Sequence, residues 1–338
     1  MNPKPAFMIL MLTERCNLRC RYCYLEATSA GRDMDEQTLV QALKLADHGA
    51  SCHLQLSGGE PTLRPDLIEM TGRLSRKFRR PPQLGLQTNA TCLEQHLLSL
   101  CREYGFQVGV SLDGPPAVQE ELRGNATATL KGLELLDREN IPFRVTTVIS
   151  HRNILELDRL ILLLARFGNC LGLGFDLLVR RGRSTSGEPA PASGEELEKG
   201  LTRALAALKL VNQTRSRPLQ LRELEILRRT WRQQPFCPAV TGRSLAVGVD
   251  GTLYTCSQNF GDPEFSRGTL KQPLSGPAPA ATNCRLPTTE ACSTCHLSGR
   301  CPGDCPGRLH HNSVEEQTLA CRLWQSLAVS TCCGESNP

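Results

Sequence analysis

Long hydrophobic runs are missing from this chain of 338 residues. The clearest one extends from Phe7 to Leu12, far short of the roughly 20 apolar residues that a membrane-spanning helix needs. No signal-peptide cleavage pattern follows it. These absences argue against a membrane protein or a membrane partner, and we expect a cytoplasmic location.

Aromatic residues and lysine are also scarce. Phe, Trp and Tyr make up 4% of the chain, and only 7 of its 39 basic residues are lysine. Proteins that bind single-stranded nucleic acid interleave basic side chains with aromatic rings that stack on bases. The short clusters Arg79-Arg80 and Arg180-Arg181-Gly182-Arg183 contain no such ring. The net charge of +5 therefore does not indicate nucleic-acid binding, although contact with an acidic peptide or a phosphate is compatible with it.

What the chain does have is the composition of a folded protein with an unusual number of cysteines. Hydrophobic residues make up 40% of the chain and charged residues 22%, which allows one large α/β unit with a smaller appendage. The 17 cysteines occur in clusters. Disulfide scaffolds are typical of short secreted chains, so the clusters favour metal or iron–sulfur ligands.

Short apolar strands alternate with amphipathic helices in the first half of the chain. The expected strands are Phe7 to Leu12, His53 to Leu56, Gln83 to Gln87, Gln107 to Leu112, Phe143 to Ile149 and Leu171 to Leu178. The expected helices lie at about 35–48, 65–78, 92–104, 127–140 and 154–167, and two more follow a Gly/Pro/Ser-rich stretch, at about 195–212 and 219–232. Such alternation predicts a parallel sheet, either doubly wound or a full or partial barrel, with ligands at the carboxyl ends of its strands.

Polar residues and cysteines gather directly after these expected strands. The residues concerned are Cys16, Cys20 and Cys23 after the first strand, Gly58, Gly59 and Glu60 after the second, Asn89 after the third, and Ser111 and Asp113 at the end of the fourth. Three thiolates can each hold one iron of a cubane cluster and leave the fourth iron without a protein ligand. A zinc knuckle would need a fourth ligand, and the nearest candidates, His48 and Cys52, are poorly placed in the sequence.

The spacing CxxxCxxC, with an aromatic residue before the third cysteine and a later Gly-Gly-Glu-Pro turn, resembles the radical SAM superfamily. The resemblance implies that Cys16, Cys20 and Cys23 hold a [4Fe-4S] cluster whose open iron binds S-adenosylmethionine (SAM). Reductive cleavage of SAM would then give a 5′-deoxyadenosyl radical that abstracts hydrogen. It also implies a partial (β/α)6 barrel of the TIM type and a one-electron donor such as flavodoxin or ferredoxin.

The same resemblance implies SAM-binding roles for eight residues. Gly58, Gly59 and Glu60 would meet the amino group, Ser111 and Asp113 the ribose, Arg123 the carboxylate, Asn89 would add a further contact, and Tyr22 would cover the cluster or stack near the adenine. Loop capping is the alternative for Asn89, Ser111 and Asp113. A plain packing role is the alternative for Tyr22.

A second cysteine pattern occupies the end of the chain. Cys237, Gly251-x4-Cys256, Cys292-x2-Cys295-x5-Cys301-x3-Cys305 and Cys321 resemble the SPASM extension of radical SAM enzymes, which holds two auxiliary [4Fe-4S] clusters. By this resemblance Cys292, Cys295, Cys301 and Cys321 hold one cluster. Cys237, Cys256 and Cys305 contribute to the other, whose fourth position is open to substrate or filled by Cys284. Structural zinc, with His296, His310 and His311 nearby, is the competing interpretation.

These patterns predict an α/β protein with three parts. We expect a radical SAM partial barrel at 1–182, a linker with helices at 183–235, and a cysteine-rich SPASM domain with a short β-hairpin, helices and a C-terminal tail at 236–338.

The resemblance implies a peptide or protein substrate. We expect radical modification of a ribosomally made peptide, by a thioether or carbon–carbon crosslink. The alternatives are formylglycine formation in a sulfatase, radical dehydrogenation or epimerisation, and a non-catalytic iron–sulfur carrier. Sulfatase-maturing members carry an aspartate base directly after the cysteine of Gly-x4-Cys, where this chain has Ser257.

Recognition of a leader peptide is the remaining expectation. Cys16 lies so near the start that no winged-helix leader-binding domain precedes the barrel. A separate leader-binding protein would then read the leader, or the region 183–235 would do so with its basic groups. Arg180 and Arg181 would help to hold an acidic leader by salt-sensitive attraction.

Overall fold

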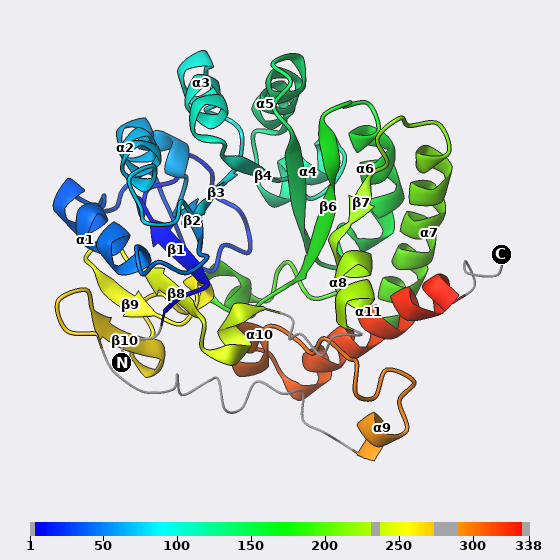
Figure 1. Ribbon diagram of the computed structural model, residues 1–338. Helices are drawn as coiled ribbons and strands as arrows, with labels where there is room; N and C mark the ends of the chain where they lie inside the picture. Colours follow the sequence, from blue (N-terminus) through cyan, green and yellow to red (C-terminus); the bar gives the residue numbers. More distant parts are fainter. Residues whose placement is uncertain (1–3, 231–236, 274–289, 333–338) are drawn as a thin grey trace.

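One curved sheet organises the chain (Figure 1). The computed structural model describes residues 4–230, 237–273 and 290–332, and in these residues the strand order is β10-β9-β8-β1-β2-β3-β4-β5-β6-β7. The strands are β1 (Phe7–Met11), β2 (His53–Ser57), β3 (Gln83–Thr88), β4 (Gln107–Ser111), β5 (Phe143–Ile149), β6 (Cys170–Leu177), β7 (Gln220–Leu221), β8 (Ser244–Val247), β9 (Thr252–Tyr254) and β10 (Ser266–Thr269). The sheet therefore ends at two edge strands, β10 and β7, and forms an open barrel.

The strands β1 to β7 are parallel to their neighbours, as the alternation of strands and helices predicts. The α-helices are α1 (Glu36–Ala46), α2 (Pro65–Ser75), α3 (Gln95–Tyr104), α4 (Pro116–Leu122), α5 (Ala126–Arg138), α6 (Leu157–Leu164), α7 (Gly194–Asn212), α8 (Arg222–Thr230), α9 (Glu290–Ser293), α10 (Pro306–His311) and α11 (Val314–Cys332). Figure 1 shows the helices α1, α2, α3, α5, α6 and α7 on the outer side of the sheet. The predicted partial (β/α)6 barrel is confirmed.

Alternation along the strands separates the core from the interior of the barrel. In β2 the side chains of Leu54 and Leu56 are fully buried, whereas Gln55 and Ser57 are half-buried and line a cavity. In β5 the buried Val145 alternates with Thr146, which lines the same cavity. Successive strand residues point to opposite faces, so apolar side chains pack under the helices and polar ones face the concave side.

The described part of the segment expected to be a linker with helices, residues 183–230, packs on the barrel. Its helix α7 packs against α6, and β7 pairs with β6 through Gly172↔Gln220 and Leu173↔Leu221. A Ser193–Glu196 capping box starts α7, which satisfies backbone N–H groups at the helix start. The segment therefore continues the strand–helix alternation.

The cysteine-rich part is joined to the barrel through the sheet. β8 pairs in parallel with β1, with Leu10 opposite Val247, and β8 and β9 form the expected hairpin. The long helix α11 packs against α7 and α8 (Figure 1), and buries Trp324. A boundary at residue 236 thus does not separate two independent sheets. Within the described residues, every helix is too short or too polar to cross a membrane.

Candidate active site

Cys16, Cys20 and Cys23 lie in one loop that follows β1 and folds back on itself. The N–H of Cys16 donates to the carbonyl of Thr28 at 2.6 Å, and the N–H of Cys23 donates to that of Cys20 at 3.3 Å. Burial, followed by the charges of Glu60, Cys20 and Cys23, raises the pKa of the Cys16 thiol to about 12. Cys20 and Cys23 pack in one cluster with the buried Cys16, so the three cysteines are close neighbours, as ligands of one metal cluster must be.

The Gly58-Gly59 turn after β2 packs directly on this loop. A Cβ on Gly58 would lie 2.4 Å from the carbonyl oxygen of Thr13, and one on Gly59 would lie 2.2 Å from that of Arg15. Gly58 also has a φ of +149°, which side chains disfavour. The N–H groups of Gly59 and Glu60 donate to the same two carbonyls at 2.8 Å. The glycines therefore hold the cysteine loop against the end of β2.

Glu60 and Asn89 connect the loop to the ends of β2 and β3. The Glu60 carboxylate is buried, and its Oε1 accepts from the hydroxyls of Thr62 and Thr88, each at 2.6 Å. Its Oε2 accepts from the N–H of Asn89 at 2.7 Å. The Asn89 amide donates to Asn17 Oδ1 at 2.9 Å and lies 4.0 Å from Cys16 Sγ. Both side chains line the cavity while organising its wall.

Asp113 is buried behind the cavity wall and does not line the cavity. Its side chain is fully buried, and its carboxylate accepts from Arg123 Nε at 2.8 Å, from the N–H of Val148 at 3.0 Å and from the Tyr22 hydroxyl. Burial raises the pKa of Tyr22, whose ring has the Arg123 guanidinium carbon 5.2 Å from its centre. Because its oxygens are occupied inside the protein, Asp113 does not fit the ribose-contacting role expected from the sequence. It positions Arg123 and Tyr22.

The other candidates line one cavity of about 370 Å³ at the carboxyl ends of the strands. The predicted residues on its wall are Cys16, Cys20, Cys23, Tyr22, Gly58, Gly59, Glu60, Asn89, Ser111 and Arg123. Ser111 accepts a hydrogen bond from Gln87 Nε2 at 3.0 Å. The structure therefore brings together all the predicted barrel residues except Asp113.

Several lining residues were missed by sequence reasoning. Tyr24, Asp176, Arg222, Ser257 and Gln258 lie on the same wall, and burial raises the pKa of Tyr24, an effect that Ser257 partly offsets. Asp176 stands at the carboxyl end of β6, a position that could have singled it out. The others reach the cavity only through contacts between distant parts of the chain.

The side chains of Arg180, Arg181 and Arg183 make hydrogen bonds and ion pairs within the protein. The Arg183 Nε donates to the carbonyl of Cys20 at 2.8 Å, Arg181 donates to the carbonyls of Gln258 and Phe260, and Arg180 Nε pairs with Glu316 at 2.8 Å. Guanidinium groups engaged in this way hold the cysteine loop, the loop after Cys256 and α11 together. This use contradicts our expectation that Arg180 and Arg181 hold an acidic leader.

The cysteines of the C-terminal part gather in two groups. Cys305 lies close enough to Cys237 and Cys256 for their charges, after burial, to raise its pKa well above the ordinary value. Cys301 and Cys321 are likewise influenced by each other or by Cys292 and Cys295. The resemblance to the SPASM extension implies the same two sets of thiols as cluster ligands, and Cys284 lies outside the described residues. The cysteines resolved at described positions form no disulfide.

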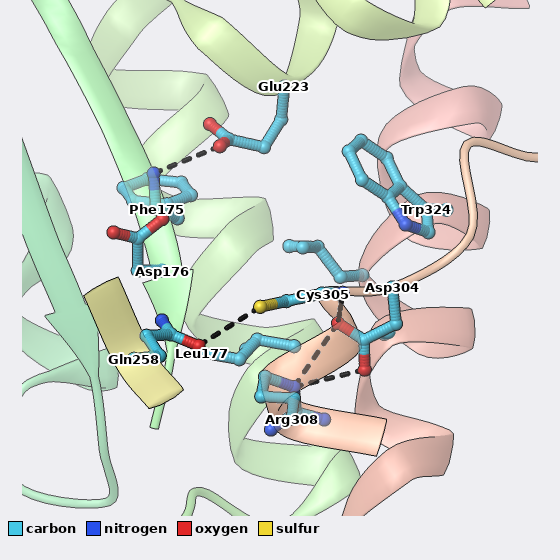
Figure 2. Close-up of a pocket in the computed structure, with 11 residues that line it drawn as sticks. Phe175, Asp176, Leu177, Glu223, Gln258, Asp304, Cys305, Arg308 and Trp324 are labelled. Carbon is cyan, nitrogen blue, oxygen red and sulfur yellow. Dashed lines mark hydrogen bonds and ion pairs between the residues drawn. The ribbon is translucent and has the colours of Figure 1, made fainter. Parts of the chain in front are cut away.

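A smaller cavity of about 80 Å³ adjoins the first of these groups (Figure 2). Its wall includes Cys305, whose thiol lies 3.1 Å from Gln258 Oε1, and the ion pair of Arg308 Nε with Asp304 at 3.0 Å. Separately, the ligand atoms of Asp262, His310 and His311 lie within 4.8 Å of one another. His310 and His311 thus group with a carboxylate, whereas the competing zinc interpretation paired them with the cysteines.

Comparison with known proteins agrees with the resemblance found in the sequence. The Radical SAM superfamily model matches residues 10–164. Uncharacterized protein MJ0907 of Methanocaldococcus jannaschii is 30% identical over 74% of this chain and 84% of its own length. A serine-type anaerobic sulfatase-maturating enzyme of Klebsiella aerogenes is 28% identical over 91% of this chain and 82% of its own. The PqqA peptide cyclase of Methylorubrum extorquens is 31% identical over 49% of this chain and 44% of its own.

Solved structures extend the likeness over nearly the whole chain. Native anSMEcpe with bound AdoMet and Cp18Cys peptide has a TM-score of 0.79 at 18% identity and covers 97% of both chains. SuiB of Streptococcus suis, bound to the precursor peptide SuiA, has a TM-score of 0.65 at 14% identity, covering 92% of this chain and 74% of its own. At these identities the likeness establishes a common fold.

Proposed function

The chain belongs to the radical SAM superfamily, and from this premise we propose that it is an enzyme that starts a radical reaction on a peptide. The observation that carries the proposal is the group of three thiols in one loop, opening onto a cavity at the carboxyl ends of the barrel strands. The family implies a [4Fe-4S] cluster with SAM. When bound, this pair supplies a 5′-deoxyadenosyl radical that abstracts a hydrogen atom.

We assign Cys16, Cys20 and Cys23 as the ligands of that cluster. Three thiolates leave one iron open, and the loop is held from both sides by Gly59 and Arg183. Backbone carbonyls near Gly58 can accept hydrogen bonds from the amino group of SAM. Arg123 donates from Nε and Nη2 to Asp113 and also lines the cavity, where its positive charge suits the carboxylate of SAM. Tyr22, Ser111 and Asn89 complete the pocket around the nucleoside.

We further assign the two C-terminal cysteine groups to auxiliary [4Fe-4S] clusters. Cys292, Cys295, Cys301 and Cys321 offer four thiols, and Cys237, Cys256 and Cys305 offer three. Soft thiolate donors in these numbers suit iron–sulfur clusters. The barrel, with the segment 183–235, would carry the SAM chemistry, and residues 236–338 would carry electrons. An external one-electron donor, flavodoxin or ferredoxin, would reduce the enzyme.

A peptide substrate is supported by the size of the cavity and by the relatives. The cavity extends beyond the cysteine loop to Asp176, Arg222 and Ser257. The PqqA peptide cyclase and SuiB, bound to its precursor peptide, are both similar to this chain. We propose crosslinking of a ribosomally made peptide, through a thioether or carbon–carbon bond. A separate leader-binding protein fits this proposal, since Arg180 and Arg181 are engaged internally.

Formylglycine formation in a sulfatase is the second candidate. It is favoured by the likeness to the sulfatase-maturating enzyme over most of both chains. It is disfavoured by Ser257, which stands directly after Cys256 where that branch carries its aspartate base.

Co-expression separates the two candidates. The enzyme is produced anaerobically with each short peptide encoded beside its own gene, and the same peptides expressed alone serve as controls. Crosslinking predicts a peptide lighter by two hydrogen atoms that does not react with an aldehyde reagent. An aldehyde-reactive product on a sulfatase peptide would favour the second candidate. Unaltered peptides of both kinds would contradict a peptide-modifying function.

Replacing Gly59 by alanine tests how the cysteine loop is held. The new Cβ would meet the carbonyl of Arg15 at 2.2 Å, so the loop must move. We expect the free energy of unfolding to fall by about 1–3 kcal/mol and the iron bound by this loop to be lost faster to a chelator. Gly168→Ala is the matched control, because its Cβ would be 3.9 Å from the nearest atom. Equal iron release from the two variants would contradict this role.

A further inference from the structure

Three residues stand between the two cavities described above. Asp176, Leu177 and Gln258 line both the larger cavity, which contains the Cys16 loop, and the smaller one, which contains Cys305. Figure 2 shows Asp176 and Leu177 on β6, with Gln258 beside Cys305. A substrate that reacts at the cysteine loop and passes an electron toward Cys305 would have to lie against this partition.

Asp176 is the available carboxylate on the wall of the larger cavity. Among the described residues that line this cavity, Glu60 is the other acidic one. Glu60 is 1% exposed, and its oxygens already accept from Thr62, Thr88 and Asn89. The Asp176 side chain is 40% exposed. A base must be able to touch the proton that it removes, and Asp176 meets this condition whereas Glu60 does not.

Asp176 is held in place by Arg222 and Glu223. The Arg222 Nη2 donates to Asp176 Oδ1 at 2.8 Å, and its Nε donates to Glu223 Oε1 at 2.8 Å. Glu223 is fully buried and also accepts from the N–H of Phe175 at 3.0 Å (Figure 2). Gly174 leaves room for the guanidinium, because a Cβ there would lie 2.8 Å from Arg222. Within the described residues no donor reaches Asp176 Oδ2, which leaves this oxygen open to a substrate.

We propose that Asp176 is the catalytic base of the reaction, taking a proton from the heteroatom or carbon of the peptide that becomes bonded or oxidised. This rests on the proposed function. Ser257, which cannot act as the base found in sulfatase maturation, lies on the same cavity wall. Asp176 supplies the carboxylate from β6, and its charge adds to burial in raising the pKa of the nearby Cys256 thiol.

The proton and electron balance requires such a group. Formation of one crosslink removes two hydrogens from the peptide. The two bonds that held these hydrogens break, and one new bond forms between the two atoms that carried them. One leaves as a hydrogen atom to the 5′-deoxyadenosyl radical. The other would leave as a proton to Asp176, and its electron would go to an oxidised auxiliary [4Fe-4S] cluster held by the thiols on the Cys305 side. Asp176 then returns the proton to water through the open side of the cavity.

The test compares Asp176→Asn with Asp158→Asn. Asparagine keeps the size and the hydrogen bond to Arg222 but is not basic. Asp158 is the matched control, since it pairs with Arg203 at 2.6 Å on the helices outside the barrel. The probe is the peptide that the wild-type enzyme modifies in co-expression, deuterated at the crosslinked position. The readout is the amount of crosslinked product per deuterated 5′-deoxyadenosine.

We expect this ratio to fall about 100-fold or more in Asp176→Asn, because general bases contribute roughly 10²–10⁴ in rate, and to stay unchanged in Asp158→Asn. An unchanged ratio in Asp176→Asn would overturn the proposal. So would a parallel loss of deuterium transfer and product, which would make Asp176 a substrate-binding residue. If the wild-type enzyme modifies no peptide, the proposed function itself fails, and the two failures are therefore distinguishable.

Discussion

Replacing Cys16, Cys20 and Cys23 together by alanine is expected to abolish the cleavage of SAM to 5′-deoxyadenosine. The 5′-deoxyadenosyl radical forms only from SAM that is bound to a cluster with an open iron. The loop of Cys16, Cys20 and Cys23 supplies the thiols that would hold this cluster. The C-terminal cysteine groups lie in other elements and should keep their metal. The variant should therefore retain roughly two-thirds of the iron of a protein with three [4Fe-4S] clusters.

The control for this variant removes three other thiols. Cys52, Cys101 and Cys170 are buried, and burial raises the pKa of each to about 11, 12 and 11. Their replacement by alanine should leave iron content and SAM cleavage near the wild-type level. Iron analysis and chromatography of 5′-deoxyadenosine measure both quantities. Loss of all iron from the Cys16/Cys20/Cys23 variant would contradict separate cluster sites, and persistent cleavage would contradict the assignment of this loop.

Replacing Cys292 or Cys321 by alanine is expected to separate SAM cleavage from product formation. The two thiols belong to the group of four in the C-terminal part, far along the chain from the cysteine loop of the barrel. An auxiliary cluster built there would pass the substrate electron onward from the cluster on the Cys305 side. Without it, the cluster on the Cys305 side stays reduced and cannot oxidise the substrate radical. Crosslinked peptide per SAM cleaved should therefore fall at least about 100-fold, while electron paramagnetic resonance shows one cluster signal missing.

A control variant and one contrary outcome test this role of Cys292 and Cys321. Cys101→Ala, a buried cysteine of α3, is the matched control and should leave the ratio of product to SAM cleaved unchanged. If Cys292→Ala and Cys321→Ala keep that ratio as well, the cysteine group has no part in electron transfer. Zinc in place of iron at this position would support the structural interpretation of the spacing.

Much of the barrel could be predicted because its strands and helices carry strong patterns. The strand expected at Phe143 to Ile149 has the same bounds in the structure, and its buried and half-buried residues alternate strictly. The helix expected near 35–48 is α1, which Asp35 caps by accepting from the N–H of Thr38 at 2.6 Å. Local periodicity and caps suffice for such elements, because their burial follows directly from the sequence.

Elements whose stability depends on distant partners could be predicted only in part: the hairpin of β8 and β9 was expected, but its pairing with β1 and the strand β7 were not. The strand β8 gains its hydrogen bonds from β1, more than two hundred residues earlier, and β7 has two residues, Gln220 and Leu221. The short helix α4 (Pro116–Leu122) gives too few residues for a periodic pattern. In α11 the apolar stripe is mixed with Cys321 and Gln325, and the helix is stabilised by packing of Trp324 and Leu327 in the core. Tertiary contacts decide these cases.

In the candidate site, too, some features follow from the sequence and others depend on tertiary contacts. Residues at the ends of the strands or directly after them, such as Ser111 and Gly58, line the cavity as expected because parallel strands end on one face. The direction of a side chain at that face depends on its partners, which the sequence does not display. Asp113 turns inward to Arg123, whereas Asp176 faces the cavity because Arg222, separated from it by 46 positions, holds one of its oxygens.

The most direct test of the central claim is anaerobic purification and reconstitution of the wild-type chain, followed by quantification of iron, sulfide and 5′-deoxyadenosine formed with SAM and a reductant. The account predicts about twelve iron atoms and as many sulfides per chain, which correspond to three [4Fe-4S] clusters, together with reductive cleavage of SAM. Zinc in place of iron, or iron without SAM cleavage, would contradict it.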